Sequence, residues 1–181
     1  LQLNNNEYRR KTTNAYNLTG SFTYNLSKQW SFKTTVGYEK TRLVDRQFSD
    51  SLTSISRLQG SNKPVLQLDT TNRTQLTNTN VVTFKLNNYK KKHDLDVVAG
   101  QEMVIFKQDF SGNLRRNLPS NIAVKDALAD TSLGDYFQGF PVIRKNESSL
   151  LSFFSRVNYT FNKKYIVSFN FRADGSSKFA D

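Results

Sequence analysis

The stretch SFFSRVNYTFNKKYIVSFNFRADGSSKF, residues 152–179, decides the fold, because its hydrophobic side chains recur at every second position. Residues of one parity are mostly apolar or aromatic on both sides of the central NKK: Phe153, Val157, Tyr159 and Phe161 before it, and Tyr165, Val167, Phe169 and Phe171 after it. Successive side chains of a β-strand point to opposite faces, so the pattern predicts two strands with one apolar face each. The short connection 162–164 predicts that they form an antiparallel hairpin.

Two more hairpins lie upstream of this stretch. The first joins residues 16–26 to residues 30–38 through Ser27-Lys28-Gln29, and its apolar parity contains Tyr16, Leu18, Phe22, Tyr24, Leu26, Trp30, Phe32, Val36 and Tyr38. The second turns at residues 87–93, and the strand before that turn has Leu76, Val82, Phe84 and Leu86 on one parity. We therefore expect six antiparallel strands in sequential order.

The strand that follows residues 87–93 has a less regular pattern. Leu95, Val97 and Ala99 share one parity, whereas Val104 and Phe106 have the other. A β-bulge near Gly100 would bring both sets to the same face, because a bulge inserts one extra residue into a strand.

The connections between the strands alternate between short and long. Short turns fall at 27–29, 87–93 and 162–164, whereas the long connections, about 47–72 and 109–146, contain all three prolines. Outer-membrane barrels have short periplasmic turns, long extracellular loops and strands of about ten residues. The fold class that this pattern predicts is all-β, a section of a transmembrane antiparallel up-and-down β-barrel.

The composition agrees with strands that are apolar on one face and polar on the other. The hydrophobic fraction is only 36% and the mean hydropathy is -0.62, yet aromatic residues make up 13%. A soluble β-sandwich that binds carbohydrate or protein is the alternative interpretation of the same alternation. That alternative predicts strands that are covered on both faces.

A net charge of +11 raises the possibility of a basic β-protein that binds nucleic acid. Such a protein would bind with an affinity that falls steeply with salt. However, the basic runs Lys90–Lys92 and Lys163–Lys164 lie in expected tight turns, and no known nucleic-acid motif accompanies them. We interpret them as solvated turns and expect no nucleic-acid partner.

The sequence offers few residues for catalysis. It has no cysteine and a single histidine, His93, so it cannot supply a thiolate nucleophile or several histidine ligands. Its glycines do not form a phosphate-binding loop. Asp126, Asp130 and Asp135 lack the spacing of a calcium-binding EF-hand. We expect no enzyme activity, no cofactor and no metal.

Residues 152–179 also contain a specific motif, which resembles the barrel signature of SusC/RagA-type TonB-dependent transporters. The signature is an Arg-x-x-Tyr strand, a Lys-Tyr turn, a returning strand and Arg-x-Asp-Gly-Ser-Ser-x-Phe. The residues that match it are Arg156, Tyr159, Lys164, Tyr165, Arg172, Asp174, Gly175, Ser176, Ser177 and Phe179. Upstream, Ala99-Gly100-Gln101-Glu102 is similar to the family's preceding segment. Lys163 replaces the usual acidic turn residue, and residues 1–92 match only in their hairpin pattern.

The motif also has a physical interpretation. Arg156 and Arg172 share the polar parity on neighbouring strands, where a charge would face the barrel lumen rather than lipid. The run Asp174-Gly175-Ser176-Ser177 has the composition of a turn at the rim of a barrel. We therefore predict a structural role for the signature residues.

The resemblance implies a function for a larger protein. Six strands cannot close a barrel, and the family uses a 22-stranded barrel with a plugged lumen. Residues 1–181 are then expected to form part of the barrel wall, and the plug domain is expected to lie outside this chain. The implied protein spans the outer membrane of a Gram-negative cell and imports a nutrient such as oligosaccharides or peptides. Its implied partners are TonB, outer-membrane lipid and a SusD-like surface lipoprotein.

One loop segment, 135–141, has the character of a recognition site. Its aromatic residues Tyr136, Phe137 and Phe140 could contact a substrate or a partner, because exposed rings stack on sugars and pack against proteins. Packing of the loop on itself is the alternative, and we favour it, since long compact loops bury their own side chains.

Overall fold

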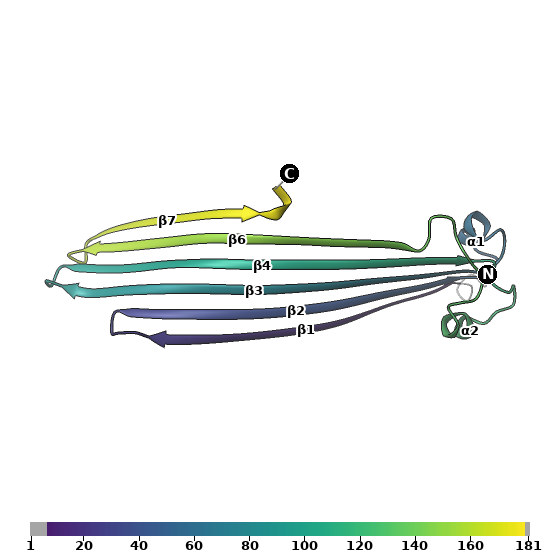
Figure 1. The fold of residues 1–181 in the computed structure, drawn as a ribbon, viewed down its shortest axis with the longest axis horizontal. Helices are drawn as coiled ribbons and strands as arrows, with labels where there is room; N and C mark the ends of the chain where they lie inside the picture. Colours follow the sequence, from purple (N-terminus) through teal and green to yellow (C-terminus); the bar gives the residue numbers. More distant parts are fainter. Residues whose placement is uncertain (1–6, 180–181) are drawn as a thin grey trace. The chain divides into compact units, whose positions relative to one another are not determined.

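The computed structural model describes residues 7–179, which form a single open β-sheet with two short α-helices (Figure 1). The elements are β1 (Glu7–Asn25), β2 (Trp30–Ser49), α1 (Ser54–Gln59), β3 (Val65–Tyr89), β4 (His93–Arg116), α2 (Val124–Ala129), β5 (Asp135–Tyr136), β6 (Val142–Phe161), β7 (Tyr165–Ser176) and a 3-10 helix (Ser177–Phe179). The strand order is β1-β2-β3-β4-β6-β7, and the two-residue β5 pairs with β4. The six predicted strands in sequential order are confirmed.

The short connections are tight turns. The turn between β6 and β7 is closed by the Lys164 N–H, which donates to the Phe161 carbonyl over 3.0 Å. Its central residues Asn162 and Lys163 both have positive φ, 51° and 55°. Two central residues with positive φ are the feature of the type I′ turn, whose twist matches that of a hairpin. The turn between β3 and β4 has the same feature at Lys90 and Lys91, so it is shorter than the predicted 87–93.

The strands extend further than the hydrophobic pattern predicts. The first begins at Glu7 instead of Tyr16, and the long connections shrink from 47–72 and 109–146 to 50–64 and 117–141. The added segments are rich in charged and polar residues, so they have no apolar alternation to reveal them. Backbone ladder hydrogen bonds do not require apolar side chains, and the pairing therefore continues past the end of the pattern.

The bulge predicted near Gly100 is wrong. Before Gly100, Lys85 pairs with Asp96 (Nζ–Oδ2 4.0 Å), and after it the Thr79 hydroxyl donates to Glu102 over 3.4 Å. Both contacts join an odd residue of β3 to an even residue of β4, so the alternation is unbroken. Val104 and Phe106 consequently share the face of Asp96 and Glu102. Individual apolar side chains can lie on the polar face of a sheet. Hydrophobicity alone therefore placed Val104 and Phe106 on the wrong face.

The chain divides into two compact units. The loop unit contains Leu1–Ala15, Lys40–Arg73 and Gln108–Asn146, and the strand unit contains Tyr16–Glu39, Thr74–Lys107 and Glu147–Asp181.

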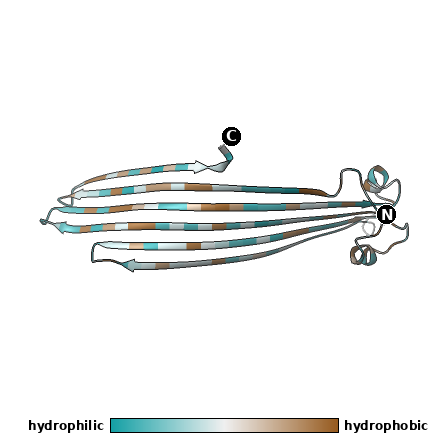
Figure 2. Cartoon of the chain, viewed as in Figure 1, coloured by the Kyte–Doolittle hydropathy of each residue, from teal (hydrophilic) through white to brown (hydrophobic). Residues whose placement is uncertain are grey.

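The strand unit is a single layer with two different faces. The β6–β7 register pairs Val157 with Phe169 on one face and Arg156 with Asn170 on the other. Figure 2 shows hydrophobic and hydrophilic residues alternating along the strands. Large apolar side chains stay uncovered, with Phe22 and Phe169 both 60% exposed. The predicted separation of apolar and polar residues onto two faces is confirmed for the β6–β7 hairpin. The β-sandwich alternative is not favoured, because it predicts that these residues are buried between two sheets of the chain.

The loop unit has a small core of its own. The buried residues Phe48, Leu66, Leu118 and Ala127 form it, and partly buried neighbours surround it: Tyr8, Leu68, Ile122, Val124 and Leu128. Helix α2 supplies Ala127, and α1 is capped by the Thr53 hydroxyl, which accepts from the Ser56 N–H over 3.1 Å. Neither helix was predicted from the sequence, because six residues are too few to show a helical period.

No helix in residues 7–179 combines the length and hydropathy needed to cross a bilayer.

Candidate functional site

The polar face of the strand unit is organised around Arg172. Its Nε donates to Asp174 Oδ1 over 2.9 Å, and its Nη2 lies 3.4 Å from Glu102 Oε1 and 3.0 Å from Ser152 Oγ. Glu102 is on β4 and Arg172 on β7, with β6 between them in the sheet. The guanidinium therefore reaches across β6 to Glu102, and it also binds Asp174, which lies two residues further along β7.

Ser152 makes this reach possible. It is fully buried and lies opposite Asp174 in the β6–β7 register. Its hydroxyl accepts a hydrogen bond from Arg172 Nη2, so the guanidinium lies directly over it. A larger side chain at this position would occupy the space through which Arg172 crosses β6. The network joins three strands, and the structural role expected for Arg172 stays a prediction.

Gly100 couples the two parts of the sequence motif. A Cβ on Gly100 would lie 2.8 Å from Cε2 of the Phe154 ring and 2.9 Å from the Asn80 carbonyl oxygen. At such distances the Phe154 ring or the Asn80 backbone would have to shift to accept any larger residue, so glycine fits under the ring without strain. The Ala-Gly-Gln-Glu segment of β4 therefore packs against the signature strand β6 through Gly100 and the Phe154 ring. Both segments belong to the sequence motif, but no local pattern indicates that Phe154 is the side chain that meets Gly100.

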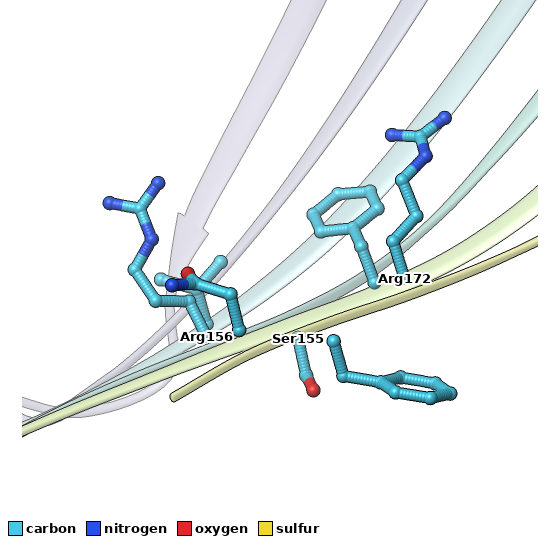
Figure 3. A pocket seen from close by; sticks show the side chains of 7 residues that line it. Ser155, Arg156 and Arg172 are labelled. Carbon is cyan, nitrogen blue, oxygen red and sulfur yellow. The ribbon is translucent and has the colours of Figure 1, made fainter. Parts of the chain in front are cut away.

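Arg156 lies beside this network in a shallow depression of about 500 Å³. The depression is lined by Val98, Phe154, Ser155, Arg156, Asn170, Phe171 and Arg172. Figure 3 shows Arg156 and Arg172 pointing to the same side of the strands and Ser155 to the other. Arg172 is neutralised by two carboxylates, whereas Arg156 is exposed and has no acidic partner within 4.0 Å in the described chain. The depression can therefore attract an anionic group, but it contains no nucleophile–base pair.

The tyrosines of the signature lie on the opposite, apolar face. Tyr159 pairs with Val167, and Tyr165 stacks beside Phe161 at a centroid distance of 6.5 Å. The Tyr159 hydroxyl lies 2.7 Å from Nδ1 of His93. His93 is the first residue of β4 rather than part of a turn, and its ring also packs 5.2 Å from Phe161. The single histidine is thus part of an aromatic cluster. The lysines that precede it in the sequence had indicated a polar turn instead.

The predicted turn at Asp174–Ser177 is wrong. Strand β7 continues through Ser176, and Gly175 and Ser176 pair with Leu151 and Leu150. The Ser177 hydroxyl then accepts from the Ser149 N–H over 2.8 Å before a 3-10 turn begins. Ladder pairing and the Arg172 ion pair hold residues whose types favour turns. The side chain of Phe179 lies outside the described residues.

The loop aromatics pack largely on residues of the same unit. The Arg115 guanidinium lies 3.5 Å from the Tyr136 ring centroid, and Arg116 lies 5.5 Å from that of Phe137. The Phe137 and Phe140 rings meet edge to face at 6.5 Å. Tyr136 is nevertheless 44% exposed, so one face of its ring is accessible. A contact of these residues with a substrate or partner stays a prediction.

The charges of the loop unit include one well-ordered pair. Arg9 Nη2 lies 2.7 Å from Asp45 Oδ2, and Lys11 approaches the same oxygen at 3.6 Å. The hydrogen bond from Arg9 holds the pKa of Asp45 below its usual value, although burial opposes the shift. Asp69 behaves in the opposite way, because burial raises the pKa of its carboxyl. In residues 7–179 no three acidic or histidine side chains gather as metal ligands.

Three solved structures with a similar fold are transporter chains. The chain matches the RagAB peptide transporter with 21% identity, a TM-score of 0.75 and coverage of 97% of this chain and 19% of that one. RagAB peptide importers in the closed-closed and open-open states each match at 22% identity, covering 96% of this chain and 18% of theirs, with TM-scores of 0.75 and 0.72. Neither protein-family models nor curated proteins give a match.

These likenesses show the fold. The chain has the architecture of a section of the RagA barrel, and it spans about a fifth of the length of the transporter chains that it matches.

Proposed function

We propose that this chain is part of the barrel wall of a SusC/RagA-type TonB-dependent transporter, which imports a nutrient across the outer membrane. The sequence signature in residues 152–179 and the similarity in fold to RagAB support this proposal independently. Both concern the architecture of a transporter. Neither supplies a catalytic arrangement, and we propose that the chain is not an enzyme.

The observation that carries the proposal is the contrast between the two faces of the strand unit. On one face, large apolar side chains such as Trp30 and Phe169 are 46% and 60% exposed. The other face carries the ion network of Arg172. An exposed apolar band fits contact with lipid, and a polar face fits a lumen or plug. In water such an apolar face would promote association.

The open edges of the sheet support the same conclusion. Strands β1 and β7 each have one neighbour in the described sheet, so each leaves a row of N–H and C=O groups without ladder partners. Each unpaired group costs several kcal/mol in lipid. We infer that both edges pair with barrel strands from outside these 181 residues. The tight turns would then be periplasmic turns, and the long connections 50–64 and 117–141 would be extracellular loops.

The substrate class and partners follow from the same proposal. The similar structures are described as peptide importers, so peptides are the first candidates, and oligosaccharides are the second. A SusD-like surface lipoprotein would meet the extracellular side, where Tyr136 is exposed. TonB would act through parts outside this chain.

Uptake in a cell tests the proposal. The gene that carries this sequence is deleted from its host, and uptake of labelled oligopeptides and oligosaccharides is measured with and without a functional TonB. We expect uptake of one substrate class to require both the gene and TonB. Uptake that persists in the deletion strain for both classes would contradict the import function.

Sedimentation of the isolated 181-residue chain tests the barrel interpretation separately. We expect it to aggregate in plain buffer or to require detergent. A monomer that unfolds cooperatively without detergent would show that the chain is a self-sufficient domain.

A further inference from the structure

In the loop unit, the positive charges on one face of β1 and β2 contact a carboxylate, whereas those on the other face do not. On the odd-numbered face, Arg9 and Lys11 both contact Asp45. The even-numbered face carries four cations, Arg10, Lys40, Arg42 and Arg46, and all four are exposed. None has an acidic group within 4.0 Å in the described chain, as the ion pairs found there involve other residues.

The sequence explains why these four cations lack partners. The even-numbered residues of the two segments are Tyr8, Arg10, Thr12 and Asn14 on β1 and Lys40, Arg42, Val44, Arg46 and Phe48 on β2. There is no carboxylate among them. Exposed surfaces normally mix both signs of charge, because unpaired like charges on one face repel each other. This face, the "cationic strip" of Arg10, Lys40, Arg42 and Arg46, is therefore free to bind an anion from outside the described chain.

The position of the strip along β2 indicates where that anion lies. The even-numbered side chains of β2 are Trp30, Phe32, Val36 and Tyr38 before they become Lys40, Arg42 and Arg46. Aromatic residues end the apolar band of a transmembrane strand at the level of the lipid headgroups. Under the proposed function, on which this inference rests, Lys40 and Arg42 follow at headgroup level on the lipid-facing side.

The length of the strip distinguishes between lipids. Lys40 and Arg46 are six residues apart, which corresponds to about 20 Å along a strand and about 15 Å of height at a tilt of about 40°. The headgroup layer of a phospholipid is only about 5–8 Å thick on each side. A headgroup that carries several phosphates on an extended sugar would match the strip better than a single phosphodiester would.

We propose that the cationic strip binds the phosphates of a phosphorylated glycolipid in the outer leaflet. Arginine guanidinium groups bind phosphate in a bidentate manner, and three of the four residues are arginines. Lys40 and Arg42 hold the phosphates nearest the acyl chains, and Arg10 and Arg46 hold those further out.

Lipid binding to the full-length protein in dodecyl maltoside, followed by native mass spectrometry, tests this assignment. The probes are bisphosphorylated lipid A, its dephosphorylated form and inorganic phosphate. The test variant replaces Arg10, Lys40, Arg42 and Arg46 with Gln, and the matched control replaces Lys28, Lys33, Lys90 and Lys91 with Gln, which removes the same charge elsewhere. A third variant, with Arg10, Arg42 and Arg46 changed to Lys, keeps the charge of the strip.

We expect the test variant to bind bisphosphorylated lipid A at least tenfold more weakly than the unmodified protein, and the control to differ by less than twofold. The lysine variant should bind with an affinity between those of the unmodified protein and the test variant, because lysine keeps the charge but not the bidentate geometry. Added salt should weaken binding to the unmodified protein. Equal losses in the test and control variants would overturn the proposal, and so would equal affinity for dephosphorylated lipid A. Displacement of the lipid by millimolar inorganic phosphate would show a site for free anions and would also overturn it.

The fold of each variant is checked by the shift in electrophoretic mobility on heating and by its presence in the outer-membrane fraction. If the unmodified protein fails these checks, the proposed function is wrong. If it passes them and binds all three probes alike, only the cationic strip has been misassigned.

Discussion

The loop unit and the strand unit differ in what covers their apolar side chains. In the loop unit, Leu66 and Leu118 are fully buried by residues of the same unit. In the strand unit, Phe22 and Val167 are 60% and 64% exposed, although they belong to long regular strands. Regular secondary structure and a self-contained core are therefore separate properties in this chain. The loop unit supplies its own apolar contacts, whereas the strand unit depends on its surroundings.

The two units also use charge differently. The strand unit concentrates its charge network on one face, where Arg172 joins strands β4, β6 and β7 through Glu102, Asp174 and Ser152. The loop unit pairs the cations of one face with Asp45 and leaves the cationic strip on the other face unpaired. Under the two proposals above, a different environment completes each unit: lipid tails for the strand unit and phosphates for the loop unit.

The largest effect should come from the core of the loop unit. Leu66→Ala removes a fully buried side chain, which should destabilise that unit by about 2–5 kcal/mol. Hydrogen exchange of the intact barrel should show faster exchange in residues 117–129 and no change in β7. The matched control is Leu58→Ala, because Leu58 is 84% exposed in the same unit. Equal effects of the two changes would mean that the loop unit has no core of its own.

The next effect concerns the apolar face of the strand unit. Val167→Arg should cost about 2–4 kcal/mol if Val167 faces lipid near the middle of the bilayer. A urea folding titration in lipid vesicles measures this cost. Ser168→Arg is the control, since the neighbouring residue faces the polar side, and it should cost much less. A larger cost for Ser168→Arg would reverse the assignment of the two faces.

A smaller effect is expected from the close packing on the polar face. Gly100→Ala should cost about 1–3 kcal/mol in the same titration, because the new methyl group must displace the Phe154 ring or the Asn80 carbonyl. Gly20→Ala is the control, because nothing lies within 4 Å of a Cβ at that position. It should change stability by no more than about 0.5 kcal/mol. Tolerance of Gly100→Ala would show that the contact can relax.

The smallest effects are those of the two carboxylates in the loop unit. The pKa of Asp45 is lowered, so its charge stabilises the folded state at neutral pH, and this stabilisation is lost as the pH falls through that lowered pKa. The pKa of Asp69 is raised, so its charge opposes folding at neutral pH, and protonation removes the penalty as the pH falls. Asp45→Asn should therefore destabilise the unit at pH 7, and Asp69→Asn should stabilise it.

The Asp45→Asn change should stay under about 1 kcal/mol, because Arg9 is more than half exposed and solvent screens the pair. The Asp69→Asn change should have the opposite sign. Local hydrogen exchange at pH 7 and again near pH 3 measures them, and both differences should shrink at the lower pH. Effects of the same sign at pH 7 would contradict the opposite shifts of the two carboxyl groups.

The face and the contacts of the signature residues could be predicted from the sequence for some residues but not for others. The polar facing of Arg156 and Arg172 followed directly from their parity, and the register confirms that they share a face. The role of Ser152 was not predictable, because a serine on a polar face is unremarkable until Arg172 is seen to cross it. The turn expected at Asp174–Ser177 failed because residue preference was weighed without the ladder partners Leu150 and Leu151.

The sequence by itself determined the number of long strands, their order and the parity of most apolar residues. These features depend on neighbours within a few residues, so local patterns in the sequence indicate them. The patterns are the alternation of apolar and polar residues and short turns such as Asn162-Lys163-Lys164. Only the tertiary structure decided which residues meet: Gly100 with Phe154, Arg172 with Glu102, and Phe48 with the loop residues Leu118 and Ala127. The reason is physical. Such contacts join residues that are far apart in the chain, and their formation depends on register, side-chain volume and space rather than on any local pattern.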